Sequence, residues 1–199
     1  MTEQRTRRAP TGAALLQPHI TSAITDAVLH ELAARGYGRL SMEAVARRAE
    51  VSKSALYRRW PSKQDMVIAV LSEFSVAQAE VSDTGSLRGD LLATLRAVRD
   101  WVTHPLFATI LPDLVAEAAR NPTLAAAIAA TIGEPRRALG AVPLRRAIDR
   151  GELPADLDLE LALDLVAAPV YWRLTVRRAP APPDHLERLA DHLVRALRG

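Results

Sequence analysis

The chain has 199 residues, 49% of them hydrophobic, which is enough for a substantial core and excludes a chain that is disordered throughout. It contains no cysteine, which excludes disulfides and thiol chemistry. Its net charge of +3 is uneven, because residues 1–65 carry eleven Lys and Arg against six Asp and Glu, whereas residues 66–199 carry fifteen against seventeen. The net charge is therefore +5 over residues 1–65 and −2 over residues 66–199. This asymmetry favours an N-terminal part that binds nucleic acid.

The N-terminal residues 1–17 are rich in arginine and lack the apolar stretch of a secretory signal. We expect them to form a flexible basic arm. Arg5, Arg7 and Arg8 could enter a DNA minor groove as basic arms do, although a plain disordered tail is the favoured alternative. The uncharged runs in the rest of the chain are shorter than the roughly 18 residues that a membrane span requires. We therefore expect a cytoplasmic protein with no membrane partner.

A first amphipathic helix is expected from about residue 20, because apolar residues recur every four positions from Ile20 to Leu32. Gly36 and Gly38 then end this helix. Apolar spacing over the next residues predicts a further short helix, and Ser41 is a suitable N-cap for it.

The stretch from Leu40 to Lys63 is the most informative part of the chain. It predicts two short helices separated by a tight turn, the second of which starts at the N-cap Ser52 and buries Leu56. This is the layout of a helix-turn-helix, whose second helix enters the major groove of DNA. The outer face of that second helix carries Lys53, Ser54, Tyr57, Arg58 and Arg59.

Pro61 and Ser62 start another helix, which is expected to run to about Val81. The segment beyond a break at residues 83–86 is also helical by pattern, and no β-strand alternation is present. We therefore expect an all-α protein. Its parts would be an N-terminal three-helix helix-turn-helix DNA-binding head, residues 18–65, and a larger C-terminal helical ligand-binding and dimerisation domain, residues 66–199.

Three prolines interrupt the helical pattern of the second domain. Proline inside a helix costs about 3 kcal/mol unless it lies in a first turn or at a kink. Pro135, Pro143 and Pro169 therefore each predict a break or a bend, and Pro169 predicts a single kinked helix. The last two helices are expected over residues 159–176 and 183–197.

The first helix, the segment LSMEAVARRAEVSKSALYRRWPSKQDM and the helical remainder together resemble the TetR family of transcriptional regulators. The resemblance is strongest over residues 19–74, and the segments GSLRGDL and VYWRL resemble one of the family's common branches. It implies a homodimer whose two heads dock into successive major grooves of double-stranded operator DNA. It also implies a helical core that binds a small molecule and then releases the DNA.

The resemblance assigns roles to residues of the second motif helix and its neighbours. Lys53, Ser54 and Ala55 correspond to positions that meet base edges, and an alanine at position 55 would be limited to a thymine methyl group. Tyr57 corresponds to a tyrosine whose hydroxyl reaches a phosphate. Arg59 corresponds to a side chain that contacts bases or backbone.

Further positions are less uniform. Lys63 corresponds to a lysine that binds phosphate, and Ser41 to a capping residue that can also donate to phosphate. Arg58 is, from the residues alone, equally a base contact or a solvated arginine. Glu50 departs from the family, which commonly has glycine at this turn position, and a residue with a side chain is strained at positive φ.

The second domain holds the features expected of effector binding and dimerisation. Its aromatic residues cluster in two places, where they either line an apolar effector pocket or serve ordinary core and dimer packing. The last two helices, with wide Leu and Ala faces, are candidates for a four-helix dimer interface. The candidate pocket residues are Trp101, His104, Phe107, Tyr171 and Trp172.

Patterns typical of catalysis are missing from the sequence. The five histidines are scattered, and neither a Gly-rich phosphate loop nor a nucleophile elbow occurs. We therefore expect no enzyme activity, no cofactor and no metal site. The favoured function is a homodimeric repressor released from its operator by a small apolar effector. The alternatives are a ligand-independent regulator or an activator, and a helical interaction module or enzyme that uses the head only as scaffold.

Overall fold

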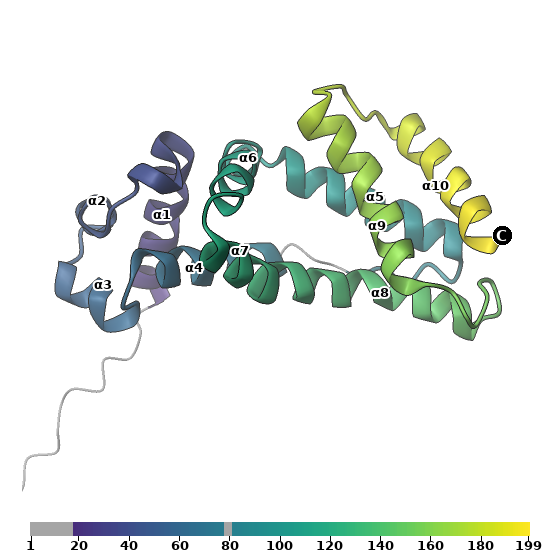
Figure 1. Ribbon diagram of the computed structural model, residues 1–199, viewed down its shortest axis with the longest axis horizontal. Coiled ribbons are helices and arrows are strands. Elements are labelled where there is room, and N and C mark those ends of the chain that lie inside the picture. Colours follow the sequence, from purple (N-terminus) through teal and green to yellow (C-terminus); the bar gives the residue numbers. More distant parts are fainter. Residues whose placement is uncertain (1–17, 78–80) are drawn as a thin grey trace, which may run out of the picture.

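The computed structural model describes residues 18–77 and 81–199, so the basic arm expected at residues 1–17 lies outside the described residues. Every regular element within the described residues is helical, which confirms the expected all-α class. The elements are α1 (Pro18–Arg39), α2 (Met42–Arg48), α3 (Lys53–Arg59), α4 (Lys63–Ala77), α5 (Leu87–Thr103), α6 (Phe107–Ala118), α7 (Pro122–Ile128), η1 (Ala129–Gly133), α8 (Glu134–Asp149), α9 (Leu159–Tyr171), η2 (Trp172–Val176) and α10 (Pro183–Arg198). Figure 1 shows an elongated molecule with α1, α2 and α3 at one end and α9 and α10 toward the other.

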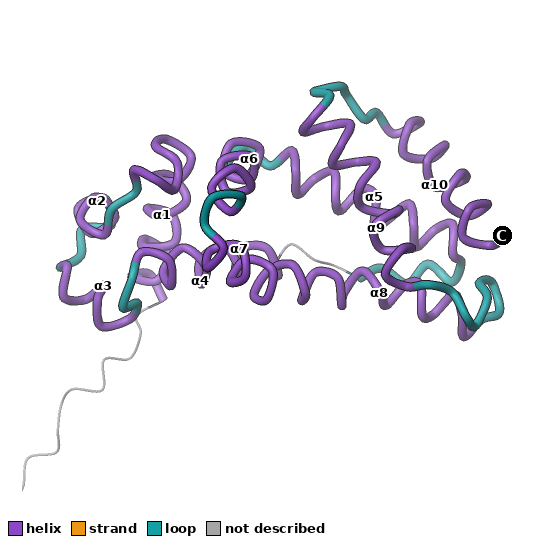
Figure 2. The backbone as a smooth tube through the Cα atoms, viewed as in Figure 1, coloured by secondary structure: helices purple, strands orange, loops and turns teal. Residues whose placement is uncertain are grey.

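Side-chain caps explain where several of these helices begin. In α2, α3 and α5 the oxygen of a serine, at Ser41, Ser52 and Ser86, accepts a hydrogen bond from the backbone nitrogen three residues later, each at 3.2 Å. Asn121 and Asp158 do the same for α7 and α9 at 3.0 Å. Each cap satisfies one of the backbone donors that a helix N-terminus leaves without a partner. The starts of these helices are therefore well defined, and each follows one of the loops that Figure 2 shows.

One hydrophobic core joins the head to part of the second domain. Leu32 and Leu56 of the head and Leu71 of α4 are at most 2% exposed, and the same cluster includes Phe107 and Ile110 of α6. The cluster extends further into α7 and η1. The boundary expected at residue 65 therefore does not coincide with a gap in the core.

A second core lies among α5, α8, α9 and α10. Leu186, Leu193 and Leu197 of α10 are at most 5% exposed and belong to this cluster together with Leu91 and Leu95 of α5. The charged residues of α10 occupy its outer face. The leucine face of the last helix therefore packs within the chain, and a dimer interface formed by the last two helices has to use their other faces.

Proline has different effects at the three positions. Pro135 follows the π-helical turn of η1, and because proline has no N–H, the carbonyl of Thr131 loses its helical donor. The Ser72 hydroxyl donates to that carbonyl instead, at 3.1 Å. Pro169 lies shortly before the π-helical segment η2, which is where the expected distortion occurs. The break or bend expected at Pro143 does not interrupt α8, which continues to Asp149.

The helix that follows the head is α4, and residues 78–80 directly after it lie outside the described residues. It ends at Ala77 within the described residues, whereas the expected end was about Val81. Val81 is not helical, and the break expected at residues 83–86 is present.

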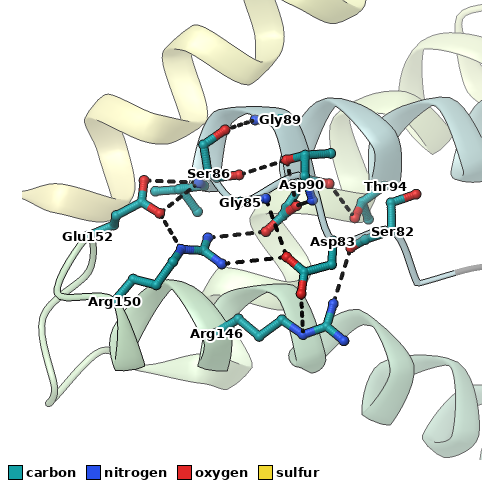
Figure 3. Close-up of polar contacts among 12 residues, drawn as sticks. Ser82, Asp83, Gly85, Ser86, Gly89, Asp90, Thr94, Arg146, Arg150 and Glu152 are labelled. Carbon is teal, nitrogen blue, oxygen red and sulfur yellow. Dashed lines mark hydrogen bonds and ion pairs between the residues drawn. The ribbon is translucent and has the colours of Figure 1, made fainter.

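A polar cluster ties the start of α5 to the end of α8 (Figure 3). The buried carboxylate of Asp90 accepts hydrogen bonds from the Thr84 backbone nitrogen and hydroxyl, both at 2.7 Å, and pairs with Arg150 at 3.1 Å. Arg150 also pairs with Glu152 at 2.7 Å, and Glu152 accepts from the Leu87 backbone nitrogen at 2.9 Å. Because each buried polar group has a partner, the cluster fixes the two helix ends against each other.

Candidate nucleic-acid interface and effector cavity

Helix α3 packs against the rest of the head through one buried residue and exposes its opposite side to solvent. Leu56 is 0% exposed, whereas Tyr57 is 48% exposed. Lys53, Ser54 and Arg58 are also exposed. A short helix with a buried anchor and an outward row of hydroxyl and cationic groups has the geometry needed to enter a major groove.

The turn between α2 and α3 is closed by a strained residue. Glu50 has φ 55°, the left-handed conformation that favours glycine. Two hydrogen bonds, from Val51 N to the Ala46 carbonyl at 3.0 Å and from Glu50 N to the Arg47 carbonyl at 3.4 Å, form the Schellman pattern that ends α2. The strain anticipated from the glutamate at this position is therefore present.

Several basic side chains of the head already have partners within the chain. Lys53 pairs with Glu43 at 2.9 Å, and this hydrogen bond lowers the pKa of the Glu43 carboxyl. Arg59 is half-buried and donates from Nη2 to the Thr21 hydroxyl at 3.3 Å. The basic groups of α3 are thus unequal, because Lys53 lies on the exposed surface and Arg59 is directed toward α1.

Lys63 and Ser41 hold the backbone of the head together. The Lys63 amino group donates to the Tyr37 carbonyl at 2.9 Å and lies 4.4 Å from the centre of the Tyr37 ring. Ser41 uses its oxygen as an acceptor for Ala44 N at 3.2 Å. Both side chains retain donors, since an ammonium has three N–H groups and a hydroxyl has one O–H.

The head is joined to α6 at the end of α1. The Asp113 carboxylate accepts a hydrogen bond from Tyr37 N at 2.7 Å. The preceding Gly36 has φ 73° and ψ 166°, so the regular part of α1 ends there, near the expected position. A Cβ at Gly36 would lie 2.6 Å from Asp113 Oδ1, so glycine permits both the bend and the close approach.

A cavity of about 500 Å³ lies among α5, α8 and α9. This volume lies within the range of small-molecule sites, about 300 to 1,000 Å³. Most of its lining is apolar, and two of the predicted pocket residues, Trp101 and Tyr171, contribute to it. Its polar side chains include Thr94, Arg136 and Arg137.

Two family models match the chain. The model for bacterial regulatory proteins of the tetR family matches residues 24–70. The model for the tetracyclin repressor-like C-terminal domain matches residues 81–193, which is more than half of the chain. The chain belongs to the TetR family.

Individual relatives agree with this assignment. The chain is 35% identical over 178 residues to the DNA-binding transcriptional repressor TetR of Mycobacteroides abscessus, covering 89% of this chain and 93% of that protein. It is 32% identical over 173 residues to an uncharacterized HTH-type transcriptional regulator of Mycobacterium bovis, covering 86% of this chain and 83% of that one. The crystal structure of the TetR family transcription regulator SCO0332 has a TM-score of 0.72 at 32% identity, covering 89% and 97% of the two chains. The chain is thus a DNA-binding transcriptional regulator.

Three of the residues expected to bind an effector do not line the cavity of this TetR family regulator. Phe107 is 2% exposed and belongs to the core shared with the head. Its ring stacks on Phe74 of α4 at 4.9 Å, and the His104 ring meets Phe74 edge-on at 5.0 Å. Trp172 is 57% exposed. Phe107 and His104 therefore pack between the cavity and the head rather than inside the cavity.

Trp101 connects these two environments. Its ring is 5.1 Å from that of Phe107 and 4.0 Å from the guanidinium carbon of Arg136. Sequence reasoning did not identify Arg136, because its contact with Trp101 links positions 35 residues apart and no spacing along α8 indicates it. Asp113 was also missed, although a carboxylate inside the apolar segment LFATILPDLV is a signal that could have found it.

An exposed apolar row runs along the α9–η2 segment. Leu161, Leu165, Trp172 and Val176 are 56%, 39%, 57% and 50% exposed. Large apolar side chains gathered on one exposed face are typical of a protein interface. Over residues 18–77 and 81–199, no helix has the length and apolar character required to cross a bilayer.

Proposed function

We propose that this TetR family regulator is a homodimeric repressor that reads its operator with α3 and leaves it when a small molecule occupies the cavity. The observation that carries the proposal is the arrangement of α3, which is anchored by Leu56 and exposes Lys53, Ser54 and Tyr57. The cavity among α5, α8 and α9 supports the effector-responsive mode over a ligand-independent one.

Base and phosphate contacts divide between the exposed groups of the head. Lys53, Ser54 and Arg58 read base edges, because they project from the outer side of α3. Ala55, which is half-buried, is restricted to an apolar contact with a thymine methyl group. Arg59 is the weaker candidate for base contact, since its guanidinium is directed at Thr21.

Phosphate contacts set the orientation of the head. The Tyr57 hydroxyl is exposed and can donate to a phosphate oxygen. Ser41 and Lys63 retain the donors that their contacts within the chain do not use, and they lie at the starts of α2 and α4. These residues position the head, whereas the α3 side chains carry the sequence preference.

The dimer forms through the outer faces of the last helices. The apolar row of α9 and η2, with Leu165 and Trp172 at its centre, supplies the surface that a second copy would bury. The outer face of α10 adds charged residues beside this row. Two heads held in this way would span successive major grooves, about 34 Å apart.

The test is fluorescence anisotropy with a labelled duplex from the region upstream of the regulator's own gene, at two salt concentrations. Tight, salt-sensitive binding is expected for the wild-type protein. Binding should be lost in a triple variant, Lys53→Ala, Tyr57→Ala and Arg58→Ala. Arg120→Ala, which removes an exposed charge after α6 and outside the proposed dimer surface, serves as the matched control and should bind normally.

Two results would contradict the proposal. A triple variant that binds as well as the wild-type protein would show that α3 does not read DNA. If a selection from random duplexes also yields no preferred sequence for the wild-type protein, the helical interaction module would become the better reading.

A further inference from the structure

Arg136 is a cation on the wall of an apolar cavity. Its Nη1 donates to the Ser75 carbonyl at 2.9 Å, and its guanidinium stacks on Trp101 at 4.0 Å. Among the described residues, no carboxylate forms an ion pair with it, whereas the neighbouring Arg137 pairs with both Glu160 and Asp164. Burial lowers the pKa of Arg136, as expected where water is removed from a cation.

The donors on this wall outnumber their acceptors. A guanidinium has five N–H donors, and the contact with Ser75 uses one of them. The Trp101 indole nitrogen, on a residue that also lines the cavity, is buried with no acceptor among the described residues. A buried donor without an acceptor is costly. Arg136 is half-buried and has no anion beside it among the described residues. The Arg136 guanidinium and the Trp101 indole N–H both need the same kind of partner, an oxygen that only accepts hydrogen bonds.

The remaining charges of the cavity compensate one another. Asp164, on the α9 wall, pairs with Arg137 at 2.7 Å, so these two contribute little net field. Arg136 therefore leaves the cavity with an excess of positive charge. Most of the other lining residues, such as Val98, Leu139 and Val166, are apolar.

We propose that the cavity takes an amphipathic anion, whose apolar body lies among α5, α8 and α9 and whose carboxylate or phosphate-type group binds Arg136. This rests on the proposed function, because it names the chemical class of the effector for the same cavity. A planar guanidinium pairs with either acid group through two parallel hydrogen bonds, which fixes the orientation of the bound molecule.

The same guanidinium links the cavity to the head. Ser75 lies in the last turn of α4, and Lys63 at the first residue of α4 holds the Tyr37 carbonyl at the end of α1. An acid group that binds the remaining N–H donors and draws the guanidinium into the cavity lengthens its hydrogen bond to the Ser75 carbonyl. Binding of the anion therefore weakens the hold of α8 on α4 and changes the position of the head, which couples the cavity to DNA affinity.

The test uses three probes of equal chain length: decanoate, decan-1-ol and decyltrimethylammonium. Isothermal titration calorimetry with the full chain should show decanoate binding at least tenfold more tightly than either of the others. Decanoate should also weaken operator binding in the anisotropy assay. Neither result depends on a variant that has to fold.

Substitutions at two arginines of α8 assign the preference. Arg136→Gln should lower decanoate affinity at least tenfold and remove the preference over decan-1-ol, whereas Arg136→Lys should keep it. Arg145→Gln is the matched control, because it removes an exposed cation of the same helix that does not line the cavity. This variant should retain the preference. Thermal melting of each variant verifies that it is folded.

Failure of the anion proposal can be distinguished from failure of the proposed function. Equal or tighter binding of decan-1-ol or decyltrimethylammonium, or no binding of decanoate at 1 mM, overturns the anion proposal. If such a protein still binds its operator, the proposed regulator stands and only the effector class is wrong. Loss of operator binding by the wild-type protein overturns the proposed function itself. Decanoate that binds through Arg136 and leaves operator affinity unchanged overturns the link through Ser75.

Discussion

Asp113 of α6 accepts a hydrogen bond from the backbone nitrogen of Tyr37 at 2.7 Å, which joins positions 76 residues apart. The carbonyl of the same tyrosine accepts from Lys63 at 2.9 Å. A single residue at the end of α1 thus meets both α6 and the start of α4. If α6 moves relative to the head, the hydrogen bond between Asp113 and Tyr37 either breaks or moves the end of α1 with it. This hydrogen bond therefore connects the second domain directly to the DNA-binding head.

Replacing this carboxylate should destabilise the protein. Asp113→Ala leaves Tyr37 N, a partly buried donor, without its acceptor, at a cost of about 1 to 3 kcal/mol. Asp113→Asn keeps an acceptor oxygen and should cost less. Urea unfolding of the two variants checks the order. An alanine variant as stable as the wild-type protein would contradict the role given to this contact.

Two nearby glycines should respond differently to alanine. Gly36→Ala should lose about 2 kcal/mol of stability, because φ 73° with ψ 166° is a conformation almost confined to glycine and the new Cβ would meet Asp113. Gly38→Ala should be close to neutral, since a Cβ there meets nothing within 4 Å. Thermal unfolding of both variants measures the difference. Equal destabilisation would contradict the importance given to the bend and the close approach at Gly36, because the loss of glycine flexibility alone stabilises a protein.

Relief of strain in the turn between α2 and α3 should stabilise the head. Glu50→Gly removes the penalty of a left-handed non-glycine residue, about 1 to 2 kcal/mol. The greater freedom of glycine in the unfolded chain offsets part of this, so a net gain of roughly 0.5 to 1 kcal/mol is expected. Chemical denaturation gives the value. Glu50→Ala, which keeps a Cβ, should show no such gain.

The cluster in Figure 3 predicts a loss of stability in acid. Burial raises the pKa of Asp90, but hydrogen bonds from Thr84 and the pair with Arg150 outweigh it, and the pKa is lowered. The backbone hydrogen bond from Leu87, followed by Arg150, also lowers the pKa of Glu152. Both carboxylates therefore stabilise the fold fully above their unfolded-state pKa values, about 4, and lose that effect as pH falls through the lower folded values. Urea midpoints measured between pH 7 and pH 3 should decline below about pH 5.

Two substitutions compare the stability contributed by this buried cluster with that of an exposed ion pair. Asp90→Asn leaves Arg150 without its buried partner and should cost about 3 kcal/mol. It should also make the acid decline shallower. Asp191→Asn removes an exposed pair with Arg88 and should change stability far less, because solvent screens that pair. Similar losses in the two variants would contradict the structural importance of Asp90.

A single charge should disrupt the proposed dimer. Leu165→Glu places a carboxylate in the apolar row of α9, where a second copy would have to bury it. Sedimentation analysis should find a monomer with weakened operator binding. Val115→Glu changes an equally apolar residue of α6 that is 51% exposed and lies outside this row, so it should remain dimeric. A dimeric Leu165→Glu variant would place the interface elsewhere.

Local signals made most of the helix positions predictable. Ser41, Ser52 and the Asn121-Pro122 pair start helices for reasons contained in two or three residues, namely a side chain that accepts a backbone hydrogen bond and a proline that begins a helix. The recognition helix could be read in the same way, from one buried leucine and the polar residues around it.

The second domain was less predictable because its features depend on packing between distant segments. The leucines of α10 show only that one face is buried, and nothing in their spacing indicates whether α5 or a second copy covers it. Trp101 and Phe107 are close in sequence and in space, yet only Trp101 lines the cavity. The position of the Arg136 guanidinium on the cavity wall depends on its contacts with Trp101 and Ser75, neither of which is near it in the sequence.

The core shared between the head and α6 limits how this regulator can be recombined. Phe107, Ile110 and Leu114 complete the apolar cluster of α1 to α4. A chimera joined at residue 65 would place this DNA-binding head on the helices of another protein, which would not pack against its apolar face. The apolar residues that α6 covers in this chain would then be exposed to water. Exchange of operator specificity between such regulators is therefore better made by transplanting the outward side chains of α3 alone, which leaves every contact beneath Leu56 unchanged.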